Sequence, residues 1–219
     1  MSSRDEILGR IRAATADITA TADIPRRYAP PGRGPGQADD ALVGLFEERA
    51  SDYRATVRRC AAGDAGQVIA DAVGARPTSR RGAQRIGVPG GFPADWSALL
   101  EGAVPDDPPL DIAALDALDG VVTTCAVAIA ETGTIVLDAG PGQGSRAFTL
   151  VPDYHVAVVR TGQIVAAVPD AVAALDPARP LTWISGPSAT SDIELSRVEG
   201  VHGPRTLDIV IVSPHKAVS

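Results

Sequence analysis

Cysteine is scarce in this chain of 219 residues, and its scarcity excludes several kinds of site. Cys60 and Cys125 are the only two cysteines, lie far apart and form no CxxC pattern. They cannot supply the thiolate set of an iron–sulfur cluster, and no zinc-finger spacing is present. A disulfide framework is equally unsupported, which fits a reducing cytoplasm. We therefore expect no metal and no directly bound cofactor.

Aromatic residues and long apolar runs are also lacking. Aromatics make up 4% of the residues, whereas hydrophobic residues make up 45%. The core must then consist mainly of Ala, Val, Ile and Leu, which is typical of buried parallel strands covered by helices. No apolar run reaches the roughly 18 residues of a membrane span, and charges interrupt the apolar positions of the N-terminal MSSRDEILGRIRAA. We expect a soluble, cytoplasmic protein without a membrane span.

Positive charge is in deficit, because the net charge is −7. Nucleic-acid binding needs a clustered basic face, so we expect no nucleic-acid partner. Arginines do gather in the first half of the chain, at Arg58, Arg59, Arg76, Arg80, Arg81 and Arg85. Short charge runs usually face water, which favours a solvated surface here over a patch for an anionic ligand or a partner.

The chain is predicted to begin with an arm. Ser3 can cap a short helix with an apolar stripe at helical spacing. The run IPRRYAPPGRGPG, residues 24–36, holds four Pro and three Gly, too many for regular structure. We predict residues 1–37 to be an N-terminal helix with a linker, and residues 38–219 to be one α/β domain. Limited proteolysis should then cut first between Pro25 and Gly36.

Short strands and helices are predicted to alternate in the domain. Helical patterns cover residues 40–51, 65–73, 112–118 and 172–175. Strand patterns cover residues 56–60, 86–88, 121–124, 155–160, 163–168, 181–185 and 207–212. Strands separated by short helices favour an open, mostly parallel sheet, so the predicted fold class is α/β.

The stretch AVAIAETGTIVLD, residues 126–138, predicts a strand, a tight turn and a second strand. Glu131 ends the first apolar run. At the rim of a core, desolvation raises a carboxyl pKa and neighbouring donors lower it, which is how a catalytic carboxylate is made, although a structural glutamate in a turn looks the same. We predict Glu131 as catalytic, and the ligand contacts of this turn as Thr132, Gly133 and Thr134.

Two later loops are candidates for anion binding. The loop GPGQGSR, residues 140–146, lacks the GK[ST] ending of a phosphate loop and is not expected to lead into a helix, so a plain connection is favoured. The loop WISGPSATSDIE, residues 183–194, is expected to run from a strand into a helix start that attracts anions. Ser191 and Glu194 also fit a capping box, which would be structural. The predicted ligand contacts are Gly186, Ser188, Thr190, Ser191 and Asp192.

The segment EGVHGPR, residues 199–205, places His202 beside Gly203 just before the last strand. A histidine in such a turn can be an acid or base, or a fixed hydrogen-bond donor with a structural role. His155 and His215 lie elsewhere without a ligand pattern, so we predict no metal site. No GxSxG elbow supports a Ser/His/Asp triad. We predict His202 as the second catalytic residue and Gly203 as a ligand contact.

Four motifs, AETGTIVLD, PDYHVAVV, ISGPSATSDIE and EGVHGPR, occur in an order and spacing that resemble the LutC branch of the LUD (lactate utilisation) domain family. The resemblance is detailed in the C-terminal half and covers only the layout of the N-terminal half. It implies a fold like that of the NagB, ribose-5-phosphate isomerase and CoA-transferase superfamily. It also implies a role in oxidising L-lactate to pyruvate with other lactate-utilisation subunits. Related members carry a cysteine-rich extension that this chain lacks, which implies that the iron–sulfur clusters lie in partners.

The same resemblance leaves two alternatives. CoA transferases of this superfamily use a glutamate in a Glu-x-Gly turn as acyl nucleophile, and Glu131 before Thr132 and Gly133 looks similar, which implies an independent acyl- or CoA-transferring enzyme. A non-catalytic scaffold subunit is the third possibility.

Ligands of open α/β sheets gather beyond the carboxyl ends of strands. We therefore expect Glu131, Ser188 and His202 to converge there on a small anionic ligand.

Overall fold

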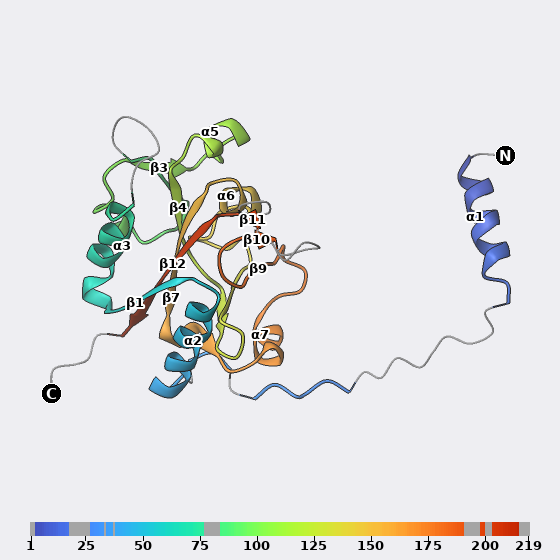
Figure 1. Cartoon of the computed structure of the whole chain (residues 1–219), viewed down its shortest axis with the longest axis horizontal. Helices are drawn as coiled ribbons and strands as arrows, with labels where there is room; N and C mark the ends of the chain where they lie inside the picture. Colours follow the sequence, from blue (N-terminus) through green and yellow to red (C-terminus); the bar gives the residue numbers. More distant parts are fainter. Residues whose placement is uncertain are drawn as a thin grey trace.

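The main sheet of the computed structural model has six strands, all paired in parallel, in the order β1-β12-β7-β4-β2-β3 (Figure 1). The structure describes residues 3–17, 27–32, 34–36, 38–76, 84–190, 198–199 and 203–214. The strands are β1 (Thr56–Ala61), β2 (Ile86–Pro89), β3 (Ala103–Asp106), β4 (Gly120–Thr124), β7 (Tyr154–Arg160) and β12 (Thr206–Ser213). The predicted open, mostly parallel α/β fold is confirmed.

The central strands are buried on both faces, which explains their nearly continuous apolar sequences. Helix α3 (Ala65–Gly74) covers one face, where Ile69 and Val73 meet Val156 and Val210. Helix α2 (Asp40–Asp52) covers the other face, where its Phe46 belongs to the same core as strand residues of β7 and β12. Figure 1 shows the two helices on opposite sides of the sheet.

A second, four-stranded sheet has the order β8-β5-β6-β9. Its strands are β8 (Ile164–Val165), β5 (Val127–Ile129), β6 (Thr134–Leu137) and β9 (Thr182–Ile184). Strands β5 and β6 pair antiparallel, as the strand–turn–strand prediction for residues 126–138 requires. Strand β9 then pairs antiparallel with β6 and brings residue 184 opposite residue 135. A short hairpin of β10 (Ala189–Thr190) and β11 (Val198–Glu199) follows.

Short helices connect these strands and account for several differences from the sequence patterns. They are α4 (Ala94–Ser97), α5 (Ile112–Asp116), α6 (Arg146–Leu150), α7 (Val168–Ala174) and the 3₁₀ turns η1 (Ala62–Asp64) and η2 (Thr161–Gln163). The expectation that GPGQGSR does not lead into a helix is wrong, because the Ser145 side chain caps α6. Five residues are too few to show helical periodicity. Of the strand expected at residues 163–168, only β8 forms, because η2 ends at Gln163 and α7 begins at Val168.

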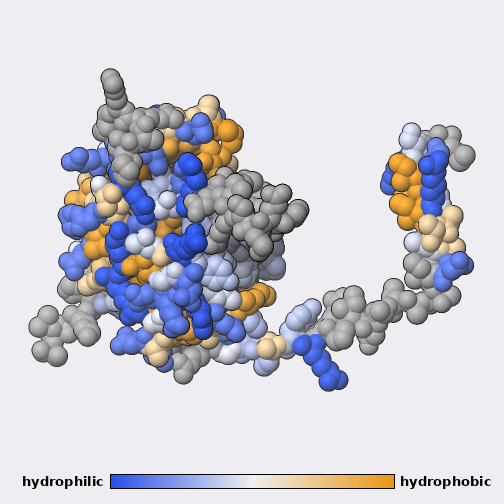
Figure 2. Space-filling view, viewed as in Figure 1, coloured by the Kyte–Doolittle hydropathy of each residue, from blue (hydrophilic) through white to orange (hydrophobic). Residues whose placement is uncertain are grey.

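The N-terminal helix α1 (Ser3–Ala14) buries none of its residues, and Figure 1 draws it apart from the sheets. Figure 2 shows apolar surface along one side of α1, where Ile7 and Ile11 are exposed. The linker is docked at its end, because the Gly32 N–H donates to Asp170 and the Gly36 N–H donates to the Gly162 carbonyl at 2.7 Å. None of the helices in the described ranges is long and apolar enough to cross a membrane.

Candidate functional site

A cavity of about 480 Å³ lies where the second sheet meets the first residues of β7 and β12. Its volume is in the range of small-molecule sites, which is about 300–1,000 Å³. The wall is formed by β9 and the loop after it, by α6 and by the residues just before β12. Its lining residues include Arg146, Thr149, Leu150, His155, Leu181, Thr182, Trp183, Ile184, Ser185, Ser188 and Leu207.

The position of this cavity differs from the expectation that ligands gather beyond the carboxyl ends of the strands. The glycine-rich loop covers the carboxyl ends of two strands, since the Gly142 carbonyl accepts from Thr124 N–H at the end of β4 and Gly142 N–H donates to the Gly90 carbonyl after β2. Its own backbone groups are thus used within the fold. The open space lies instead at the amino ends of β7 and β12, under the second sheet.

The structure brings only part of the predicted site to the cavity. Gly186, Ser188 and Gly203 line it, whereas Glu131 and the turn from Thr132 to Thr134 do not. Thr190 pairs with Val198 in the β10–β11 hairpin. Ser191, Asp192 and His202, together with the helix expected to start at Ser191, lie outside the described residues. The catalytic assignment of Glu131 and His202 therefore stays a prediction.

Glu131 lies in the β5–β6 turn with an exposed side chain, and its backbone N–H donates to the Ala166 carbonyl at 3.0 Å. The turn reaches the cavity wall through a row of hydroxyls. The Thr134 hydroxyl lies 2.7 Å from that of Thr132 and 2.8 Å from that of Ser185, a lining residue of the cavity. The predicted contacts Thr132 and Thr134 thus support the wall from behind.

Two predicted ligand contacts, Gly133 and Gly186, are used for close packing against the end of α2. Both have positive φ angles, of 59° and 77°. A Cβ atom on Gly133 would lie 2.5 Å from the Ala50 nitrogen, and one on Gly186 would lie 2.6 Å from the Tyr53 carbonyl oxygen. These contacts explain why glycine is needed at both positions.

Arg146, the first residue of α6, supplies a positive charge to the cavity. Its side chain is exposed, and its guanidinium has no hydrogen-bond or ion-pair partner among the described residues. A guanidinium binds carboxylates through two parallel hydrogen bonds. Arg146 therefore provides an anion-binding group beside the apolar surfaces of Leu150 and Leu207.

His155 lines the cavity from β7 and is 1% exposed. Its Nε2 atom lies 2.8 Å from the Thr123 hydroxyl on β4, whereas its Nδ1 atom has no partner among the described residues. Burial lowers the pKa of His155 to about 4, so the ring is neutral near pH 7. An unpaired buried polar atom costs about 1–3 kcal/mol unless a ligand or water satisfies it.

Sequence reasoning missed His155 as a site residue because it stands within the apolar strand pattern HVAVVR. The available signal was the polar residue itself, since a histidine in a strand buried on both faces needs a partner for each of its polar atoms.

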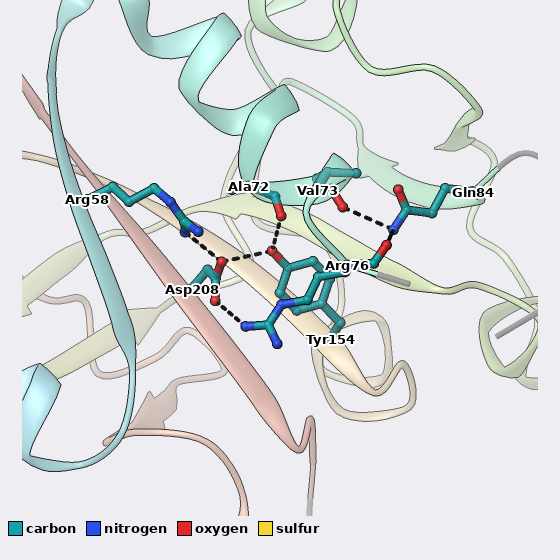
Figure 3. A network of polar contacts seen from close by, with 7 residues as sticks. All are labelled: Arg58, Ala72, Val73, Arg76, Gln84, Tyr154 and Asp208. Carbon is teal, nitrogen blue, oxygen red and sulfur yellow. Dashed lines mark hydrogen bonds and ion pairs between the residues drawn. The ribbon is translucent and has the colours of Figure 1, made fainter. Parts of the chain in front are cut away.

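A second polar cluster surrounds the fully buried Asp208 (Figure 3). Its carboxylate accepts from Arg58 at 2.6 Å, Arg76 at 2.9 Å and the Tyr154 hydroxyl at 3.1 Å. Burial raises the pKa of Tyr154, and the Asp208 charge raises it further. The solvated-surface interpretation is thus wrong for Arg58 and Arg76, which neutralise a buried carboxylate. The cluster is internally satisfied, and we assign it to the fold.

The described part of the chain contains no group of three or more His, Cys, Asp or Glu side chains arranged to hold a metal ion. Burial raises the pKa of the Cys125 thiol to about 12, which makes it unreactive as a nucleophile near neutral pH.

Comparison with known proteins gives relatives over most of the chain. A family model described as the LUD domain matches residues 112–212. Lactate utilization protein C of Deinococcus radiodurans is 49% identical over 175 residues, which cover 78% of this chain and 79% of that protein. Lactate utilization protein C of Shouchella clausii is 35% identical over 101 residues, 42% of each chain. The crystal structure of a DUF162 family protein from Deinococcus radiodurans matches with a TM-score of 0.64 and 41% identity, covering 78% of this chain and 96% of that one.

Proposed function

We propose a function for this chain, which belongs to the LUD domain family. It acts in lactate utilisation as a cytoplasmic subunit of an L-lactate-oxidising system. Relatives named Lactate utilization protein C support a role in lactate utilisation. Conversion of L-lactate to pyruvate releases electrons, and two separate cysteines cannot hold an iron–sulfur cluster. We propose that the iron–sulfur clusters of the lactate-oxidising system lie in its partner subunits.

Within this role, the cavity binds a small organic anion. The observation that carries this proposal is the guanidinium of Arg146, which lines the cavity without an ion-pair partner among the described residues. A carboxylate satisfies that guanidinium, and the apolar side chains of Leu150 and Leu207 accommodate a short aliphatic group. Ser188 and Gly203 are ligand contacts in this proposal. Ser191 and Asp192 keep that role as predictions, and His202 keeps its predicted catalytic role.

Isothermal titration of the purified full chain with L-lactate, pyruvate and propionate tests this proposal. We expect all three carboxylates to bind, and Arg146→Gln to weaken each of them roughly tenfold or more, the effect of losing a hydrogen bond to a charged group. Arg59→Gln is the matched control, because Arg59 pairs with Glu47 and does not line the cavity. Absence of carboxylate binding, or equal effects of the two substitutions, would contradict the proposal.

The acyl- or CoA-transferring alternative depends on Glu131. Its side chain in the β5–β6 turn is exposed and so accessible to a thioester, which is the observation that favours this alternative. It requires turnover of an acyl-CoA by the purified chain alone, whereas the proposed subunit requires its partners for lactate oxidation.

A further inference from the structure

His155 contributes the only buried side-chain nitrogen or oxygen atom without a hydrogen-bond partner in the described part of the chain. The residue lines the same cavity as Arg146. Its register partners, Val121 on β4 and Leu207 on β12, are buried and apolar, so the flanking strands offer Nδ1 no side-chain partner at that level. The cavity that His155 lines has room for a ligand or a water molecule that supplies a partner for this nitrogen.

The contact with Thr123 leaves Nδ1 able to play either hydrogen-bonding role. A neutral imidazole has one donor and one acceptor nitrogen, and a threonine hydroxyl can donate or accept. When Thr123 donates to Nε2, Nδ1 carries the proton and donates to a ligand carbonyl. When Thr123 accepts from Nε2, Nδ1 accepts from a ligand hydroxyl. One ring can therefore pair with an alcohol or with a ketone.

We propose that His155 makes the cavity selective for 2-hydroxy and 2-oxo monocarboxylates, by hydrogen bonding through Nδ1 to the oxygen on the carbon next to the carboxylate. This inference rests on the proposed carboxylate site at Arg146. Arg146 binds the carboxylate, and His155 Nδ1 forms a hydrogen bond with the oxygen on the neighbouring carbon. Leu150 and Leu207, which line the same cavity, contact the short aliphatic substituent.

Two substitutions separate this role from a structural one. A glutamine amide sits at the depth of Nε2, so His155→Gln keeps a partner for Thr123 and removes the polar atom at the Nδ1 position. An asparagine amide sits at the depth of Nδ1, so His155→Asn keeps that atom and loses the contact with Thr123. If His155 is purely structural, His155→Asn should be the more destabilised variant, because it loses the contact with Thr123. If His155 selects the ligand, His155→Gln should lose the preference for carboxylates that carry a 2-oxygen.

The test is titration of the full chain with L-lactate, pyruvate and propionate, the last of which lacks the 2-oxygen. We expect the wild type to bind L-lactate and pyruvate about tenfold more tightly than propionate, the effect of one well-placed hydrogen bond. His155→Gln should bring the three affinities together without weakening propionate, and His155→Asn should retain part of the preference.

A wild type without preference for the 2-oxygen, or a His155→Gln protein that keeps the preference, would overturn the inference while leaving the carboxylate site intact. Loss of all carboxylate binding would instead refute the proposed function. If the glutamine variant does not fold, nitrogen NMR of the wild-type ring decides. The Nδ1 resonance should shift with L-lactate but not with propionate, and equal shifts would refute the selective role.

Discussion

At the scale of single residues, the burial of the His155 ring couples folding to pH. In the folded protein burial lowers its pKa from 6.5 to about 4. The unfolded chain therefore binds a proton on this ring at pH values where the folded protein does not. Because protonation then favours unfolding, the stability that His155 contributes is complete above its unfolded pKa and is lost as the pH falls towards 4.

We predict that this residue lowers the free energy of unfolding by about 3 kcal/mol between pH 7.5 and pH 4. Urea denaturation of the wild type and of His155→Gln over this pH range measures the effect. Carboxylates titrate in the same range in both proteins, so the difference between the two curves isolates the histidine. Parallel curves would show that the folded-state pKa of His155 is not depressed.

At the scale of elements, the β5–β6 hairpin is positioned by glycine contacts with α2. Gly133 adopts a positive φ angle and lets the turn approach the backbone of Arg49 and Ala50 closely. The hairpin itself was predictable, since its two apolar runs flank a Thr-Gly-Thr turn. The contact with α2 was not, because it joins segments more than 80 residues apart and depends on the packing of the second sheet.

We predict that Gly133→Ala lowers the free energy of unfolding by about 1–3 kcal/mol. The added Cβ atom would overpack the contact with α2, at a residue whose positive φ angle is unfavourable for alanine. Gly74→Ala is the control, because no atom outside its chain neighbours and its own helix backbone lies within 4 Å of the added Cβ at the end of α3. That change should be neutral or stabilise by about 0.5–1 kcal/mol. Chemical denaturation of both variants measures the difference, and equal stabilities would contradict the packing role of Gly133.

Other elements mark where sequence patterns stop being informative. Five of the six strands of the main sheet were predictable from the sequence patterns, and their parallel pairing from the helices between them, whereas the edge strand β3 was missed. The five-residue helix α6, which carries Arg146, was missed because a single turn has no periodicity. The end of the sheet at which the cavity opens was also missed. It is set by the glycine-rich loop folding back onto β2 and β4, which no local pattern encodes.

At the scale of the whole molecule, the N-terminal segment changes character at Gly32. Residues 27–31 are exposed and form no helix or strand. Gly32 itself is held on the domain, because Asp170 accepts the Gly32 N–H and also accepts the Ala167 N–H at 2.9 Å at the start of α7. A second contact, from the Gly36 N–H to the Gly162 carbonyl, holds Gly36 on the domain. Because Gly32 and Gly36 are both bonded to the domain, we expect cleavage within the window from Pro25 to Gly36 to occur before Gly32.

We predict that brief trypsin treatment cuts the linker after Arg27 and spares the bond after Arg33, because that bond lies between the two anchored glycines. Mass spectrometry of the digest identifies the cut by a domain fragment that begins at Tyr28, or at Arg27 where trypsin cuts after the adjacent Arg26. Asp170→Ala removes the acceptor for the Gly32 N–H and should make the bond after Arg33 cleavable. Equal cleavage after Arg27 and Arg33 in the wild type would show that the linker is not held in solution.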